Sequence, residues 1–150
     1  MFISLSIRQS RFLSLLGGLS LMACSSGSPM PVDIVPEDMC QRCKMAISEK
    51  RLAAEFLGQD GLAFKFDDIS CMVHFLKSRS DKPPVAAIFV TDFDSGAWIR
   101  ADVAFYIRSD RLKTPMGGGA AAFKDHSKAE AEATGYQVSV MRFEELQKIF

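Results

Sequence analysis

The first half of the chain alternates short apolar runs with turn residues, a pattern typical of strands followed by a helix. Residues 52–57 and 62–66 predict two adjacent strands, and Gly58-Gln-Asp-Gly61 between them predicts a hairpin turn. Asp67 or Asp68 can then cap a helix, because a carboxylate accepts hydrogen bonds from the first free backbone N–H groups. Apolar residues recur at helical spacing after this cap and predict its core face: Ile69, Met72, Val73 and Leu76.

Lys82-Pro-Pro84 interrupts the chain before an apolar segment, residues 85–90, which predicts a strand and completes a strand-strand-helix-strand order. The second half predicts a similar order of elements, which begins with strands at residues 98–99 and 103–107. A glycine-rich loop follows them. Ser127-Lys-Ala-Glu130 matches a capping box and predicts the start of a short helix, which Gly135 is expected to end.

Two more elements are predicted after that helix. Residues 136–140 alternate in the manner of a strand, and apolar residues at helical spacing predict a final amphipathic helix: Phe143, Leu146, Ile149 and Phe150. The sequence therefore predicts an α+β protein made of two small ββαβ-type units in tandem. The first unit is expected over residues 37–82 and the second over residues 83–150.

The amino-terminal segment has the features of a bacterial export signal. Arg8 and Arg11 precede an apolar run, residues 12–22, that is shorter than the ~20 residues a membrane-spanning helix needs. Leu21-Met-Ala-Cys24 is typical of a lipobox, in which Cys24 is lipidated and becomes the new amino terminus. Residues 1–23 are therefore predicted to be a lipoprotein signal peptide, and residues 24–36, rich in Ser and Pro, a tether. An unlipidated signal cut nearby and a short retained anchor are the alternatives.

The expected location follows from the residue after the lipobox and from the charge. Ser25, rather than Asp, favours the outer membrane of a Gram-negative cell, so we expect a lipid-anchored protein on the periplasmic face of a bacterial membrane. Removing residues 1–23 removes two Arg and no acidic residue, which leaves 16 basic and 18 acidic residues and a net charge of −2. This balance argues against a nucleic-acid partner and against a polybasic membrane contact, so the lipid on Cys24 must provide the attachment.

The strongest chemical motif is Cys40-Gln-Arg-Cys43-Lys-Met45, which places two thiols and a thioether within six residues. These are soft donors that favour Cu(I) over hard cations. In an extended backbone, Cys43 and Met45 can point to one face. We therefore expect Cys43 to be the main Cu(I) ligand, with support from Met45. Cys40 is either a spare ligand or the partner of Cys43 in a disulfide that would prevent binding.

Three further residues are candidates for the same site. Cys71 and His74 lie three positions apart and share a helix face, so a zinc site with Cys40 and Cys43 is an alternative, which would make the protein a zinc-stabilised interaction module. Cys71 is otherwise expected to be a small buried core residue. His126 is the other histidine that could complete a metal site. The enzymatic alternative is a thiol-disulfide reductase or a lyase-like enzyme that uses the three cysteines.

Thr114-Pro-Met-Gly-Gly-Gly119 is the second notable motif. Three glycines permit unusual backbone angles, so Met116 is expected on a mobile loop from which its thioether can swing over a bound ion. The alternative is a flexible connection whose Met packs on the core. No Lys-Ser or Lys-Thr pair follows the glycines, so the segment is not a phosphate-binding loop.

Four motifs in order along the chain resemble the NosL family, the accessory lipoproteins of nitrous oxide reductase. They are the lipobox, Cys40-x-x-Cys43-x-Met45, Phe66-Asp-Asp-Ile-Ser-Cys71-Met and Pro115-Met-Gly117. The resemblance implies a periplasmic Cu(I) chaperone for the reductase's copper centres, with two small ββαβ-type units similar to the organomercurial lyase fold. By motif position, Cys43 and Met45 correspond to the family's Cys-x-Met pair, and Met116 to its later Met. The family usually has Gly where this chain has Lys44.

We therefore predict a lipid-anchored metallochaperone, not an enzyme, that binds Cu(I) through Cys43, Met45 and either Met116 or a histidine. A site with so few ligands has an open side, at which a thiolate, imidazole or sulfide of a recipient can attack. The expected recipient is nitrous oxide reductase or another periplasmic copper protein.

Overall fold

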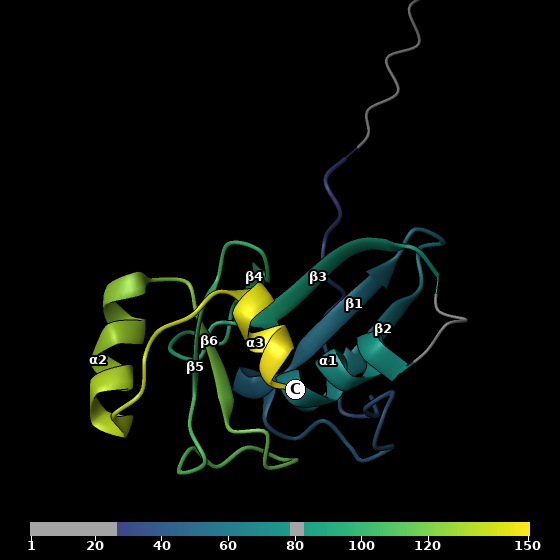
Figure 1. The fold of residues 1–150 in the computed structure, drawn as a ribbon. Helices are drawn as coiled ribbons and strands as arrows, with labels where there is room; N and C mark the ends of the chain where they lie inside the picture. Colours follow the sequence, from purple (N-terminus) through teal and green to yellow (C-terminus); the bar gives the residue numbers. More distant parts are fainter. Residues whose placement is uncertain (1–26, 79–82) are drawn as a thin grey trace, which may run out of the picture.

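The computed structural model describes residues 27–78 and 83–150, and these form a four-stranded antiparallel sheet, a two-stranded sheet and three α-helices (Figure 1). The predicted α+β class is confirmed. The predicted signal peptide, residues 1–23, and the predicted lipidation site, Cys24, lie outside the described residues. No helix among the described residues is long and apolar enough to cross a membrane.

The predicted hairpin and first helix are present. Strands β1 (Ala54–Gly58) and β2 (Ala63–Phe66) pair antiparallel across the turn, and a short 3-10 helix, η1 (Lys50–Leu52), precedes them. Helix α1 (Ile69–Ser78) follows β2 and packs against both strands. Its predicted core face is confirmed, because Ile69, Met72 and Val73 are buried and Leu76 is half-buried.

Asp68 caps α1, and its neighbour Asp67 does not. Oδ1 of Asp68 accepts a hydrogen bond from the backbone N–H of Ser70 at 2.8 Å, the bond expected of a residue that precedes the first helical turn. Both Asp67 and Asp68 are buried, at 1% and 0% exposure. Asp67 is therefore a buried carboxylate with no role in the helix cap.

Strands β3 (Val85–Thr91) and β4 (Trp98–Arg100) complete the larger sheet, whose strand order is β2-β1-β3-β4. The succession β1, β2, α1 and β3 forms the first ββαβ unit. This unit extends past the predicted boundary at residues 82 and 83, because β3 is the second neighbour of β1 and satisfies the backbone groups on its other edge.

The smaller sheet contains a strand that the sequence did not predict. Strand β5 (Phe105–Arg108) pairs antiparallel with β6 (Ala120–Phe123). The sequence of β6, Ala-Ala-Ala-Phe, has neither alternation nor β-branched residues, and all four residues are buried, so tertiary packing rather than local preference fixes this strand. Asp92 forms a parallel bridge with Ala122 and joins the two sheets.

Helix α2 (His126–Tyr136) covers the smaller sheet, but its ends differ from the prediction. Asp125, not Ser127, is the cap, because Asp125 immediately precedes the first helical residue and accepts the backbone N–H of Ser127 at 2.8 Å. The helix continues through Gly135 and ends where Gln137 adopts a left-handed conformation, with φ of 59°.

The segment after α2 corrects one prediction and confirms another. Residues 137–140 form no strand, and only Met141 makes an isolated bridge, to Tyr106. The alternation at residues 136–140 instead reflects partial burial, since Tyr136, Val138 and Val140 pack on the core beneath α2. Helix α3 (Phe143–Ile149) confirms the final amphipathic helix, and it buries Phe143 and Leu146.

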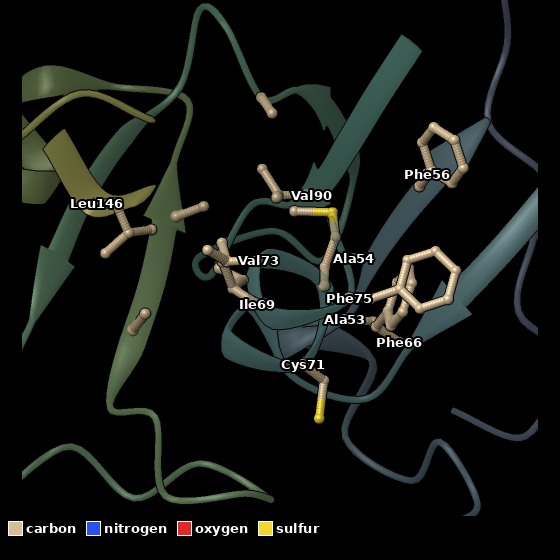
Figure 2. Close-up of a cluster of buried hydrophobic side chains, with 14 of the residues drawn as sticks. Ala53, Ala54, Phe56, Phe66, Ile69, Cys71, Val73, Phe75, Val90 and Leu146 are labelled. Atoms are coloured by element: carbon tan, nitrogen blue, oxygen red, sulfur yellow. The ribbon is translucent and has the colours of Figure 1, made fainter. Parts of the chain in front are cut away.

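One of the two hydrophobic core clusters contains residues from both halves of the molecule. Figure 2 shows this cluster, in which Leu146 of α3 lies with Ile69 and Val73 of α1 and with Val90 of β3. Ile34 belongs to the same core, at 6% exposure, and its carbonyl accepts a hydrogen bond from the Lys50 side chain at 2.7 Å. The predicted tether, residues 24–36, therefore ends earlier than expected, because its apolar Ile34 packs on the folded body.

Candidate metal centre

The Cys-x-x-Cys segment forms a closed loop at the edge of the larger sheet. The backbone N–H of Cys40 donates to the carbonyl of Met45 at 2.8 Å, and that of Lys44 donates back to the carbonyl of Cys40 at 3.0 Å. Gln41 N–H donates to the carbonyl of Lys65 in β2 at 2.8 Å. Since β2 is an edge strand, this bond attaches the loop to the strand that leads into Asp67 and α1.

Lys44 has the backbone conformation of a glycine. Its φ is 64°, in the left-handed region that most residues with a Cβ avoid at a cost of about 1–2 kcal/mol. The family resemblance implies Gly at this position. The loop therefore keeps a conformation suited to glycine while its lysine side chain is exposed to solvent.

Four side chains from two separate segments meet at this loop. Cys40 and Cys43 come from the loop, Asp67 from the junction between β2 and α1, and Cys71 from the first turn of α1. Their ligand atoms all lie within 4.8 Å of one another, and in the described part of the chain this is the only such group of Cys, His, Asp and Glu side chains. We call these four residues the sulfur cluster. Cys40, Asp67 and Cys71 are buried, whereas Cys43 is half-buried.

Cys71 is more than the core residue that the sequence predicted. Figure 2 shows its sulfur pointing away from the labelled apolar side chains of the core, although the residue is fully buried. Arg42 Nη1 donates a long hydrogen bond to this sulfur at 4.0 Å. Cys71 is therefore the buried core residue that the sequence predicts, and its sulfur also faces the sulfur cluster and the Arg42 cation.

Asp67 is the polar member of the sulfur cluster. The Cys43 thiol donates a hydrogen bond to its Oδ2 at 3.4 Å. Its Oδ1 is buried and has no hydrogen-bond partner among the described residues. A buried carboxylate oxygen without a partner is costly, so this atom is suited to face a cation or a proton.

The sulfur cluster holds one thiolate readily. A hydrogen bond from the Cys71 thiol lowers the pKa of Cys40 to about 4, and the same contact raises the pKa of Cys71 above its ordinary value. Burial raises the pKa of Cys43 to about 11, and burial together with the neighbouring Cys40 raises the pKa of Asp67 to about 6. Two thiols therefore keep protons that a bound soft cation would displace.

The two predicted methionine ligands have exposed side chains. The side chain of Met45 is 55% exposed and that of Met116 is 40% exposed. The backbone N–H of Met116 donates to Oδ2 of Asp68 at 3.1 Å. This bond holds the Pro-Met-Gly segment at the start of α1, the helix whose first turn carries Cys71.

The glycines after Met116 have a packing role that the sequence did not indicate. A Cβ on Gly118 would overlap the side chain of Ser70 in α1, and one on Gly119 would overlap the backbone of Ser109. Gly119 N–H also donates to Oγ1 of Thr114 at 3.1 Å. The loop is therefore seated closely on the start of α1 and on the end of β5.

Neither histidine belongs to the sulfur cluster as described. The ring of His74 lies 5.8 Å from that of Phe150, centroid to centroid. His126 is exposed at the start of α2, where its Nδ1 lies 3.6 Å from a carboxylate oxygen of Glu130. The four-residue set considered for zinc, with His74, is thus replaced by one in which Asp67 is the fourth member.

Asp67 is the site residue that sequence reasoning missed, because Asp67 and Asp68 were both treated as candidate caps. The sequence does contain a signal for this residue, namely that two Asp residues, not one, precede the helix. A helix needs one capping side chain at its start, so one of two consecutive Asp residues before a helix is free for another role.

Known proteins provide two points of comparison. A family model described as NosL matches residues 31–149. The crystal structure of the copper chaperone NosL from Shewanella denitrificans is similar over 77% of this chain and 94% of that chain, with a TM-score of 0.67 and 19% sequence identity. At this identity, the likeness shows the fold alone. No curated protein sequence matches the chain.

Proposed function

The chain belongs to the NosL family, and from this premise we propose that it is a chaperone that carries Cu(I) and passes it to a recipient copper protein. The observation that carries the proposal is the sulfur cluster, in which three cysteine sulfurs and a carboxylate oxygen lie within 4.8 Å of one another. Thiolate and thioether sulfur are the donors that Cu(I) prefers. The protein of the same fold from Shewanella denitrificans is a copper chaperone, which supports the same role here.

Cys43 is the residue at which copper enters and leaves. Its side chain is half-buried, whereas Cys40 and Cys71 are buried and the side chains of Met45 and Met116 are exposed. We assign an outer Cu(I) position to these three residues, with one anionic and two neutral donors. Neutral thioethers are displaced readily, so a recipient thiolate or imidazole can take the ion by ligand exchange. The protein is therefore a carrier rather than an enzyme, and copper is its cargo.

The proposal extends to location and recipient. The lipobox supports a lipid anchor at Cys24 on the periplasmic face of a bacterial membrane, with Ser25 favouring the outer membrane. Membership of the family supports nitrous oxide reductase, or another periplasmic copper protein, as the recipient. Cys24→Ser should leave the protein unprocessed or release it to the soluble periplasm. A processed Cys24→Ser form that still fractionates with membranes would exclude the lipid anchor.

The function is tested by anaerobic titration of Cu(I) against a chromophoric chelator. Cys43→Ser should abolish tight binding, because it removes the anionic donor of the outer position. Met45→Leu should weaken binding less, since it removes a neutral donor at similar volume. Met39→Leu is the matched control, because Met39 is 56% exposed and lies outside both motifs. Equal effects of Met39→Leu and Met45→Leu would remove Met45 from the site.

Asp67 favours one second candidate, a zinc-stabilised interaction module. Three thiolates and a carboxylate would give Zn(II) a closed tetrahedral site, in which every position is taken by protein. Such a site couples metal binding to folding, so a chelator would unfold the protein. Preferential binding of Zn(II) over Cu(I) in competition, together with unfolding of the metal-free chain, would favour this candidate and reject the chaperone.

A further inference from the structure

The buried part of the sulfur cluster points to a second position for the cargo. We infer that the protein holds Cu(I) at rest in an inner position formed by the sulfurs of Cys40, Cys43 and Cys71. This position is separate from the outer one at Cys43, Met45 and Met116, and Cys43 belongs to both. The inference rests on the proposed Cu(I) chaperone function and adds to it where the ion is stored.

The three sulfurs are already close enough to share one ion. A metal–thiolate bond of ~2.3 Å, the length found for zinc, places three sulfurs of a planar site about 4 Å apart. The sulfurs of Cys40, Cys43 and Cys71 lie within 4.8 Å of one another, so small side-chain movements suffice. Cys40 and Cys71 are both 0% exposed, and this enclosure protects the bound ion from water and from adventitious ligands.

The surroundings of the sulfurs favour a cation between them. Oδ1 of Asp67 is buried and has no hydrogen-bond partner within residues 27–78 and 83–150, and a cation among the sulfurs would offset that cost. Oδ2 of Asp67 accepts the Cys43 thiol at 3.4 Å, which turns Cys43 inward toward the other cysteines. Because Cu(I) prefers sulfur, Asp67 positions Cys43 and balances charge, while the three sulfurs bind the ion.

Movement between the positions exchanges ligands without changing the oxidation state. Two bonds from copper to the thioethers of Met45 and Met116 break, and two bonds to the thiolates of Cys40 and Cys71 form. Any protons on those two thiols pass to water, and the bond to Cys43 remains throughout. The exposed thioethers therefore set how fast copper is captured and released, and the buried thiolates set how tightly it is held.

The experiment compares two pairs of variants by anaerobic Cu(I) titration and by the rate of transfer to a chelator. Cys40→Ser and Cys71→Ser should each weaken Cu(I) binding by at least ~10-fold, since loss of a supporting group alone costs that much, while one ion per chain still binds. Met45→Leu and Met116→Leu should each weaken binding less than either cysteine variant does, and they should slow the transfer to the chelator.

The outcomes separate this inference from the proposed function. Wild-type affinity in Cys40→Ser and Cys71→Ser, with binding lost in Cys43→Ser, would overturn the inner position and leave the chaperone function standing. Failure of the wild-type protein to bind Cu(I) tightly would overturn both. Urea unfolding accompanies each variant. If Cys71→Ser is unfolded, Cys71→Ala replaces it, because alanine removes the sulfur without burying a hydroxyl, and the same affinity criterion then decides.

Discussion

Asp68→Asn separates the two roles of one buried carboxylate. Oδ1 of Asp68 accepts hydrogen bonds from the N–H of Ser70 at 2.8 Å and from its Oγ at 2.7 Å, and Oδ2 accepts the N–H of Met116 at 3.1 Å. Asparagine has nearly the same shape, but it has one acceptor oxygen and an NH₂ donor in place of the other. It can keep the helix cap or the contact with the Met116 loop, but not both.

The expected loss is that of one buried bond to a charged acceptor. A hydrogen bond of this kind contributes about 1.5–3 kcal/mol, so the free energy of unfolding should fall by about 2 kcal/mol. In urea, this corresponds to a midpoint lower by about 1 M. Amide exchange should also accelerate in residues 114–119, because the remaining oxygen is expected to keep the two hydrogen bonds from Ser70 and to lose the one from the N–H of Met116.

Asp125→Asn is the matched control. Asp125 caps α2 with the same pair of bonds, from the N–H and Oγ of Ser127 at 2.8 Å each, and in the described structure it holds no loop. Asparagine caps helices as well as aspartate does, so the urea midpoint should stay near that of the wild type. Equal losses in the two variants would refute the reasoning, and the placement of the Met116 loop at the start of α1 would lose its support.

Four further substitutions test other parts of the structure by urea unfolding, and for Lys44→Gly also by Cu(I) titration. Gly118→Ala should destabilise the protein by about 1–3 kcal/mol, because the new Cβ overlaps the side chain of Ser70. Gly135→Ala, in α2 with open space around the new Cβ, should stabilise it by about 1 kcal/mol. The reverse order of stabilities would contradict the close contact between the glycine loop and α1. Lys44→Gly should keep Cu(I) affinity and stability, because relief of the left-handed lysine offsets the extra chain entropy of glycine; a loss of affinity would show that the lysine side chain takes part in binding. Burial raises the pKa of Glu55, so the stability that its proton provides is present at low pH and is lost as the pH rises through that pKa. Glu55→Gln should therefore gain stability relative to the wild type as the pH rises above about 4, the ordinary pKa of Glu, and a difference that does not change with pH would exclude this cost.

The sequence predicts those elements whose cause is local. The hairpin of β1 and β2 follows from two apolar runs and a glycine turn, and α1 follows from helical spacing after an acidic cap. Strand β6 has no such local cause, because its three alanines have a high helix propensity. It is a strand because β5 pairs with it and the core encloses it.

The residues of the candidate site also divide into those predicted from local sequence and those brought together only by the fold. Cys43, Met45 and Met116 stand out by donor chemistry within short motifs, so the sequence singles them out. The meeting of Cys40 with Cys71 depends on the bond from Gln41 to Lys65, which attaches the loop to β2 beside the start of α1. A contact made through an edge strand is not visible from spacing along the chain.

The most direct test of the account is X-ray absorption at the copper edge on the wild-type protein loaded with one Cu(I) under anaerobic conditions. Both proposed positions use only thiolate and thioether donors, so we expect only sulfur atoms as the nearest neighbours of copper. An imidazole nitrogen from His74 or His126, or a carboxylate oxygen from Asp67, among those neighbours would contradict the account.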